Sequence, residues 1–431
     1  MTPVTFDQIL SKLREIFAPL SNELEAFEWL VINRDLYGRV RLIAPLLARE
    51  DNARQATLKK LSCSIAEKLA PHCYTADNIV LYESERNTVL QDVSSFQFGE
   101  FENVWVVDRL AIEGNWALIE DEQNGCPRVV FFSIKGGVGR STALAATAWW
   151  LAQAGKRVLV LDMDLESPGL STALLPNDRR PTYGIIDWLV EDLLDNGESV
   201  FDAMCAKSDL SHDGEIYIVP AHGVDAGEYI AKLGRVWMPK ISQDGKRENW
   251  QNRLRRLMDN LENKIKPDVI LIDSRAGIDE IAAGCITALG ANLVLLFALE
   301  GTQTWSSYNI LFRYWLQYGV SEKIRERLQL VGAMIPEIEK NEYLKGLRQN
   351  AYDLFADSFY DDIPAGEPIG ERFNFEESDN NAPHSPWEVN WHRGFAGLRS
   401  LHGRLAEIDS DSIRSIFAGL LGGITRTISL E

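Results

Sequence analysis

The sequence predicts an α/β protein whose core is a doubly wound, mostly parallel sheet. Apolar strand-like runs alternate with helical stretches over residues 127–336, and they read RVVFFSI, RVLVLDMD, EIYIVPA, DVILIDS, ANLVLLFAL and LQLVGAMI. Strands that are apolar throughout are typical of a parallel sheet with helices on both faces. In addition, a glycine-rich loop joins the first of these runs to a helix. These two observations predict the fold class.

Composition narrows the class of protein. The 431 residues are enough for two or three domains, and 45% hydrophobic with 25% charged residues is ordinary for a globular chain. No apolar run is long enough for a membrane-spanning helix, and the N-terminal residues mix both charge signs, unlike a signal peptide. The five cysteines are scattered and form no C-x-x-C pair, which disfavours a zinc ribbon or an iron–sulfur cluster within one chain. We therefore expect a cytoplasmic protein.

The charge balance bears on possible partners. The chain has 44 Lys and Arg against 63 Asp and Glu, a formal charge of −19. Such a chain repels a phosphate backbone unless its basic residues gather in one patch. The densest basic run holds Arg253, Arg255 and Arg256, and its leucine spacing predicts an amphipathic helix with a solvated charged face. Nucleic acid is therefore not an expected partner.

The region before the core, residues 1–125, is predicted to be a small α+β interaction domain. Strand-like runs read AFEWLVIN, GRVRLIA, NIVLYE and ENVWVVDRL, and a helix is predicted over Asp51–Leu69. The region contains no recognisable catalytic constellation. The polar segment Asp121–Cys126 reads as its linker to the core.

The region after the core, residues 337–431, is predicted to be mainly helical, with an irregular loop, and to pack on the core. Apolar residues in Ser412–Ile428 recur at helical spacing, so this segment can dock on the protein or at a dimer interface, or bind a membrane. Three glycines (Gly419, Gly422, Gly423) weaken a free helix, and only Arg414 and Arg426 flank it. These features favour docking over the membrane.

The segment VVFFSIKGGVGRSTAL (Val129–Leu144) predicts a phosphate site. Glycines let successive backbone N–H groups turn around a phosphate chain, and the start of a helix adds its positive dipole end. Ser141 is the hydroxyl placed to bind Mg²⁺. The predicted phosphate-binding residues are Gly136, Gly137, Val138, Gly139, Arg140, Ser141 and Thr142.

The loop departs from the ordinary pattern G-x-x-x-x-G-K-[ST], because Ile134 replaces the first glycine and Lys135 is added. The string K-G-G-V-G-R-S-T resembles the deviant Walker A P-loop ATPases of the MinD/ParA group (SIMIBI class), which read K-G-G-x-G-K-[ST]. The resemblance implies ATP and Mg²⁺ as cofactors, and a catalytic Lys135 that reaches the nucleotide of a dimer partner. Arg140 stands where the family has its P-loop lysine. Arginine keeps the charge but is bulkier, so we expect nucleotide binding to tolerate it better than fast hydrolysis does.

Two acidic segments follow strands of the core. RVLVLDMD ends in Asp162 and Asp164, at the carboxyl edge of the sheet where ligands bind in such folds. The resemblance implies that Asp164 orients the attacking water and that Asp162 supports the Mg²⁺ hydration shell. Simple capping of the strand end is the alternative.

The second acidic segment, DVILIDSRAGID, brings Asp273 to the same edge, where it can hold Mg²⁺ through water. MinD proteins read D-S-P-A-G-I-E here, and Arg275 replaces the proline. Two interpretations of Arg275 stay open. It either senses the γ-phosphate as a switch residue or pairs with Asp279 or Glu280.

These observations predict an ATP-binding, slowly hydrolysing ATPase that forms a homodimer on ATP binding and recruits or positions macromolecular partners. Unidentified proteins would bind through its N- and C-terminal regions. One alternative is a hydrolytically inert, ATP-sensing subunit of a multi-protein bacterial system, because Arg140 replaces the lysine. A small-molecule transferase or ligase is a third class, to which nothing in the sequence points.

Overall fold

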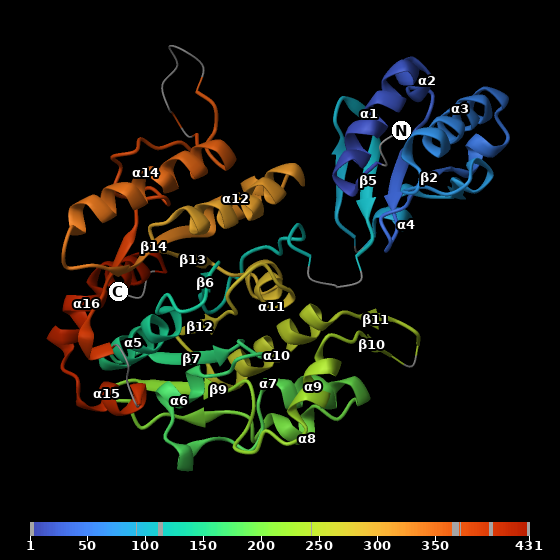
Figure 1. Ribbon diagram of the computed structural model, residues 1–431. Helices are drawn as coiled ribbons and strands as arrows, with labels where there is room; N and C mark the ends of the chain where they lie inside the picture. Colours follow the sequence, from blue (N-terminus) through green and yellow to red (C-terminus); the bar gives the residue numbers. More distant parts are fainter. Residues whose placement is uncertain are drawn as a thin grey trace. The chain divides into compact units, whose positions relative to one another are not determined.

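A computed structural model describes residues 4–91, 93–110, 115–242, 244–363, 370, 372–395 and 400–428. The chain forms two compact units. Unit 1 comprises Met1–Ile112 with Gln317–Gly319, and unit 2 comprises Glu113–Leu316 with Val320–Glu431 (Figure 1). The segment predicted as a linker, Asp121–Cys126, thus belongs to unit 2.

Unit 1 is built on a five-stranded mixed sheet in the order β3-β2-β1-β5-β4. β1 pairs in parallel with β5 and β2 with β3, whereas β1–β2 and β4–β5 are antiparallel. Asp51 accepts hydrogen bonds from two backbone N–H groups and so caps α3, which explains why the helix begins at Asn52. Its strands are β1 (Leu30–Arg34), β2 (Val40–Pro45), β3 (Val80–Glu83), β4 (Ser95–Phe98) and β5 (Phe101–Asp108). Its helices are η1 (Phe6–Gln8), α1 (Ile9–Phe17), η2 (Ala18–Leu20), α2 (Ser21–Leu24), η3 (Leu46–Arg49), α3 (Asn52–Leu69), η4 (Ala76–Asn78) and α4 (Arg86–Leu90).

Unit 2 contains an eight-stranded sheet in the order β15-β14-β13-β6-β12-β7-β9-β8. The pairings from β15 to β9 are parallel, and the edge strand β8 is antiparallel. The predicted mostly parallel core sheet is confirmed. Its strands are β6 (Arg128–Ser133), β7 (Arg157–Asp162), β8 (Ala206–Lys207), β9 (Glu215–Val219), β12 (Val269–Asp273), β13 (Leu293–Ala298), β14 (Leu328–Ile335) and β15 (Trp387–Asn390). A separate hairpin consists of β10 (Lys240–Ile241) and β11 (Arg247–Glu248).

Helices cover both faces of this sheet, as the doubly wound prediction requires. One face packs against α5 (Arg140–Gln153), α6 (Leu170–Leu174), α15 (Leu401–Glu407) and α16 (Ser410–Thr427). The other packs against α7 (Ile185–Glu191), α10 (Trp250–Ile265), α11 (Glu280–Ala283), α12 (Thr302–Gln317) and α14 (Lys340–Ser358). The remaining helices are η5 (Asn177–Arg179), η6 (Asp192–Leu194), α8 (Glu198–Phe201), α9 (Tyr229–Val236), the π-helix η7 (Gly284–Ala288), α13 (Ser321–Ile324), η8 (Arg325–Arg327) and η9 (Arg393–Phe395).

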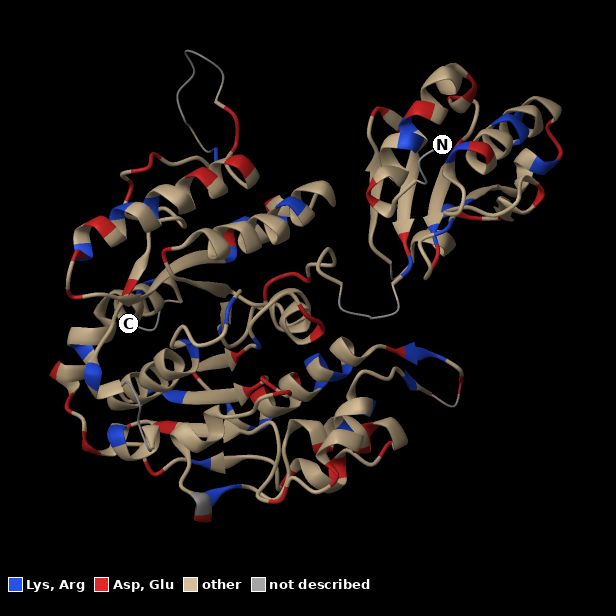
Figure 2. Ribbon diagram, viewed as in Figure 1, with Lys and Arg blue, Asp and Glu red and all other residues tan. Residues whose placement is uncertain are grey.

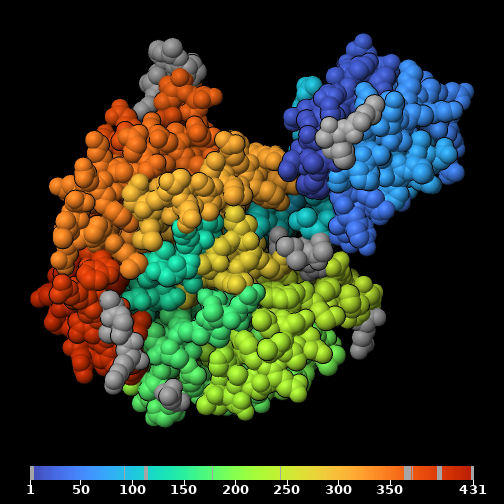
Figure 3. Space-filling view, in the orientation of Figure 1, coloured from blue at the N-terminus to red at the C-terminus, as the bar shows by residue number. Residues whose placement is uncertain are grey.

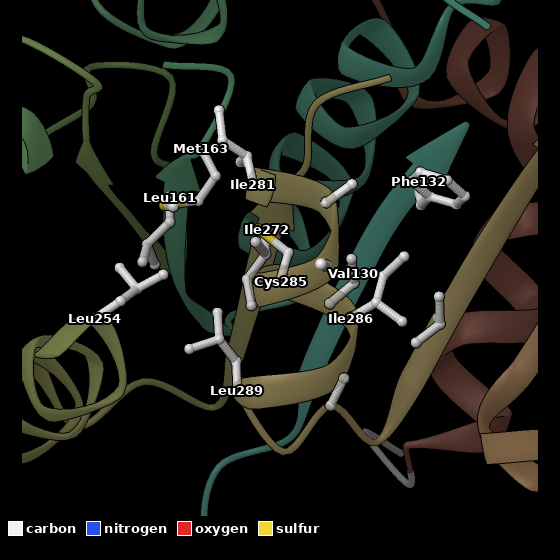
Figure 4. Packing of buried hydrophobic residues seen from close by; sticks show 14 of the residues in the cluster. Val130, Phe132, Leu161, Met163, Leu254, Ile272, Ile281, Cys285, Ile286 and Leu289 are labelled. Atoms are coloured by element: carbon white, nitrogen blue, oxygen red, sulfur yellow. The ribbon is translucent and has the colours of Figure 1, made fainter. Parts of the chain in front are cut away.

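Figure 4 shows part of the second face. Val130 of β6 and Ile272 of β12 lie near Ile281 of α11 and Cys285 of the π-helix, and all of them are buried. Asp279 caps the short helix α11, and the π-helix η7 follows it directly. Gly284, the first residue of the π-helix, packs against the Trp250 ring, where a side chain would collide.

The basic run of α10 differs from its prediction. Arg253 is fully buried, and its Nε donates to Asp192 Oδ2 at 2.9 Å. Arg256 Nη2 lies 2.9 Å from the same oxygen, and Arg255 pairs with Glu120 at 2.6 Å. The predicted amphipathic helix is found, with Leu254, Leu257 and Leu261 buried. The prediction of a solvated face is wrong for Arg253, whereas Arg255 and Arg256 remain partly exposed and form ion pairs inside unit 2. Figure 2 shows that acidic and basic residues are interspersed over this unit.

The C-terminal region contributes directly to the core of unit 2. β15 extends the sheet beside β14, a strand that the sequence did not predict. α16 packs against β15 and α5, and its apolar stripe is buried. The segment coloured red in Figure 3 therefore covers one side of unit 2. Two of its glycines permit this contact, since a Cβ at Gly419 would lie 2.6 Å from Glu388 N and one at Gly423 would lie 2.3 Å from the Trp387 ring. Among the described residues, no helix has the length and apolarity needed to cross a membrane.

Candidate nucleotide-binding site

The glycine loop lies between the central strand β6 and the start of α5. β6 ends at Ser133, and α5 begins at Arg140 after Gly139, whose φ of 82° is in the left-handed region. Gly137 has a φ of 76°, and a Cβ built on Gly136 or Gly137 would meet no atom within 4 Å. The backbone of the loop is therefore open on one side, as a loop that wraps phosphates must be.

Arg140 is the central side chain of the site. Only 7% of it is exposed, and its Nε donates to Asp273 Oδ1 at 2.8 Å. Its Nη1 donates to the Ser133 hydroxyl at 3.2 Å, and its Nη2 lies 3.6 Å from Asp164 Oδ2. The structure thus places the arginine that replaces the family lysine between two of the predicted acidic residues.

Asp162 and Asp273 lie side by side at the ends of neighbouring strands, as Cα partners in the β7–β12 pair. Burial and the nearby Asp273 carboxylate raise the pKa of Asp162 to about 7. Burial also raises the pKa of Asp273, against the opposing effect of the Arg140 guanidinium and a hydrogen bond with Ser141. The Arg140 guanidinium therefore favours the charged form of Asp273.

These residues fit a magnesium ion. Asp162 is fully buried, and its Oδ1 has no hydrogen-bond partner among the described residues. Ser141 and Asp273 offer further oxygens at the same place. The described residues contain no group of three or more His, Cys, Asp or Glu arranged to hold a metal alone. Mg²⁺ would therefore need phosphate oxygens or water as additional ligands, which is its usual mode of binding.

Asp164 follows the end of β7, and its Oδ1 accepts hydrogen bonds from the Ser167 amide at 3.2 Å and hydroxyl at 3.0 Å. Its Oδ2 faces Arg140. Lys135 lies at the start of the loop, and its Nζ donates to Gln303 at the start of α12. The structure thus brings Arg140, Asp162, Asp164 and Asp273 together, whereas Lys135 is held apart by a different partner.

Arg275 forms ion pairs with acidic residues on two loops. Its Nη2 lies 2.7 Å from Glu166 Oε2, and its Nη1 lies 3.4 Å from Asp279 Oδ2. Of the two carboxylates expected from the sequence, Asp279 is a partner, while Glu280 instead accepts from Trp250 Nε1. The Glu166 contact joins the loop after β7 to the loop after β12.

Three residues of the site were not predicted, namely Ser133, Glu166 and Gln303. Ser133 ends the strand that leads into the loop, so its place near Arg140 could have been predicted from the sequence. The other two lie 109 positions before Arg275 and 168 positions after Lys135, and no local pattern links them to their partners.

A parallel sheet whose central strand enters a glycine loop and helix beside strand-end aspartates defines a P-loop nucleotide-binding protein. The chain belongs to the CobQ/CobB/MinD/ParA nucleotide binding domain family, whose profile matches residues 129–378. The predicted membership of the MinD/ParA type is confirmed.

Among curated proteins, the chain is similar to the septum site-determining protein MinD of Buchnera aphidicola subsp. Baizongia pistaciae (strain Bp). The two are 28% identical over 161 residues, which cover 37% of this chain and 48% of that protein. The chain thus spans about half the length of this relative.

Solved structures with a similar fold include MinD from Pyrococcus horikoshii OT3 complexed with Mg-ADP, at 17% identity and a TM-score of 0.41, covering 69% of this chain and 96% of that one. A plasmid partition protein from Borrelia burgdorferi is 15% identical with a TM-score of 0.41, covering 70% and 99% of the two chains. The pNOB8 ParA bound to nonspecific DNA is 13% identical with a TM-score of 0.42, covering 70% and 97%.

The raised pKa of Asp162 predicts a pH-dependent stability. An unfolded aspartate titrates near 3.9, so between about pH 4 and 7 the folded state binds more protons than the unfolded state, and the free energy of unfolding falls as pH rises. Asp162→Asn removes this penalty. We measure the free energy of unfolding in urea and subtract the wild-type value from that of the variant. This difference should be at least about 1 kcal/mol larger at pH 8 than at pH 5. In the control, Asp202→Asn at an exposed ion pair with Lys264, the same difference should be equal at the two pH values. An equal Asp162→Asn effect at both pH values contradicts the assignment.

Proposed function

We propose that this protein binds ATP and Mg²⁺ at Lys135–Thr142 and acts as a nucleotide-dependent homodimeric switch that recruits or positions macromolecular partners. The observation that carries the proposal is the convergence of an open glycine loop, a buried guanidinium and strand-end aspartates at one sheet edge. Membership of the nucleotide-binding family supports it. A septum site-determining protein and a plasmid partition protein are among the similar proteins.

In this proposal, backbone N–H groups from Gly136 to Thr142 surround the phosphates, and α5 adds its positive dipole end. Arg140 breaks its contact with one of its carboxylate partners and donates two hydrogen bonds to phosphate oxygens. Mg²⁺, when bound, neutralises charge on the phosphates and orients them. Ser141 would ligate the ion, while Asp162 and Asp273 would hold its water ligands.

Hydrolysis in this scheme is an in-line attack by water on the γ-phosphate. Asp164 orients that water with the carboxylate that now faces Arg140. Lys135 exchanges Gln303 for the nucleotide of the partner subunit, which requires a dimer. The rate depends on how well Arg140 replaces a lysine whose single nitrogen needs less space.

Arg275 fits the role of a switch residue in this scheme. It joins Glu166 to Asp279 and so couples the loops that follow β7 and β12, next to the phosphate site. A γ-phosphate that attracts the guanidinium would break the Glu166 pair and release the loop after β7. This change would alter the surface offered to a partner.

The remaining regions are assigned by the same proposal. The proposed N-terminal interaction domain is residues 1–125, of which 1–112 belong to unit 1. The proposed ATPase core is residues 127–336, and residues 337–431 are the C-terminal region that packs on it. The protein partners bind at the N- and C-terminal regions in the cytoplasm. The burial of α16 against β15 and α5 favours docking on the core over membrane binding. The paired arginines of α10 offer little to nucleic acid.

A second candidate, a hydrolytically inert ATP-sensing subunit, is favoured by the Arg140–Asp273 pair. A guanidinium that donates to Asp273 at 2.8 Å competes with the magnesium hydration shell for that carboxylate. ATP binding would then change partner choice without turnover.

The dimeric switch predicts that ATP with Mg²⁺ doubles the mass of the full chain measured by light scattering. Asp164→Ala should keep the dimer longer, because the water is no longer oriented for hydrolysis. Lys135→Ala should bind ATP yet stay monomeric, whereas Lys323→Ala, at an exposed lysine of α13, should dimerise normally. A mass that stays constant while ATP binds rejects the cross-subunit role of Lys135.

Phosphate release separates the two candidates. The slow ATPase predicts measurable release by wild type and a rise of about tenfold or more in Arg140→Lys, equal to ~1.4 kcal/mol of barrier. Release that is absent in wild type, although ATP binds, identifies the inert sensor. Equal rates in wild type and Arg140→Lys show that arginine does not limit turnover.

A further inference from the structure

Unit 1 carries a stack of alternating aromatic and cationic side chains, formed by Tyr37, Arg39, Tyr74 and Arg41. The Arg39 guanidinium carbon lies 5.1 Å from the centre of the Tyr37 ring and 4.4 Å from that of Tyr74. The Arg41 guanidinium carbon lies 3.8 Å from the Tyr74 ring centre. Tyr37 lies in the turn before β2, and Arg39 and Arg41 flank Val40, the first residue of that strand.

Asp35 holds this Tyr–Arg stack in place. Its Oδ1 accepts from the Arg39 amide at 2.9 Å, and its Oδ2 accepts from Arg39 Nε at 3.2 Å and from the Tyr74 hydroxyl at 2.5 Å. The aspartate uses only Nε, so the two terminal nitrogens of Arg39 keep their donors for another group. A stack fixed in this way loses little side-chain entropy when a ligand binds.

The stack borders a hollow of about 340 Å³, lined by Tyr37, Arg39, Pro71 and His72. Tyr37 is 81% exposed and Pro71 is exposed, so the hollow offers apolar as well as cationic surface. Neighbouring Leu36 is 63% exposed. Tyrosine and arginine are the residue types enriched at the energetic centres of protein interfaces.

The charge of the stack is unusual for this chain. Arg41 has no carboxylate partner within ion-pair distance in the described part of the chain, and Asp35 offsets the charge of Arg39 alone. The stack therefore carries a net positive charge within a protein of formal charge −19.

We propose that the Tyr–Arg stack binds an acidic peptide segment of a protein partner. Carboxylates fit the free donors of Arg39 and Arg41, and adjacent apolar side chains fit Tyr37 and Pro71 in the hollow. A nucleic acid is disfavoured, because residues 1–112 hold 12 Lys and Arg against 16 Asp and Glu, and a phosphate backbone would meet repulsion beyond the two arginines. The inference does not depend on nucleotide binding by unit 2.

The test is the fluorescence anisotropy of a labelled peptide of alternating Glu and Leu, titrated with the full chain. We expect binding that weakens with salt, no binding of the matching Lys–Leu peptide, and affinity about tenfold lower in Arg41→Gln. The Arg41 side chain makes no hydrogen bond among the described residues, and the substitution keeps its backbone pairing in β2, so this variant should fold normally. Tyr37→Ala tests the aromatic contact separately and should also weaken binding.

Arg49→Gln is the matched control, because Arg49 belongs to the same unit and stacks on a tyrosine, Tyr82, at 5.8 Å, outside the Tyr–Arg stack. It should leave the affinity unchanged. The proposal is overturned if the Glu–Leu peptide does not bind, if Arg41→Gln and Arg49→Gln bind it alike, or if labelled oligo(dT) binds more tightly than the peptide.

Discussion

The buried ion pair between Arg140 and Asp273 is the interaction on which the candidate site depends. A charged side chain with 7% exposure is stable only with a partner, and Asp273 is that partner at 2.8 Å. The pair ties the first residue of α5 to the last residue of β12, on either side of the space where phosphates would lie. The Arg140 guanidinium also opposes the rise that burial causes in the pKa of Asp273.

The same pair shows how Arg140 differs from a lysine at this position of the loop. A lysine at position 140 would offer one nitrogen, whereas the arginine donates to Asp273 and Ser133 and approaches Asp164. Ligand binding must therefore compete with contacts inside the chain. In the proposed function, the balance between these contacts and the phosphates separates a slow ATPase from an inert sensor.

Much of the core and the positions of the site residues followed from the sequence, because their signals are local. The apolar runs gave the six long strands of unit 2, and the glycine loop and strand-end aspartates follow those strands directly. The short strand β15 has only one buried residue, Val389, so its pattern did not distinguish it from a loop. The burial of Arg253 could not be predicted from the sequence either, because it depends on Asp192, which lies 61 positions away.

The account rests on phosphate binding by the glycine loop, and calorimetric titration with ATP and Mg²⁺ tests this most directly. Gly137 and Gly155 both have left-handed φ values, 76° and 79°, and a Cβ on either would meet no atom within 4 Å. Alanine therefore strains the two positions alike, but only position 137 belongs to the loop. We predict that wild type and Gly155→Ala bind ATP equally and that Gly137→Ala binds at least about tenfold more weakly. Equal affinities in all three proteins, or no binding by wild type, would contradict the account.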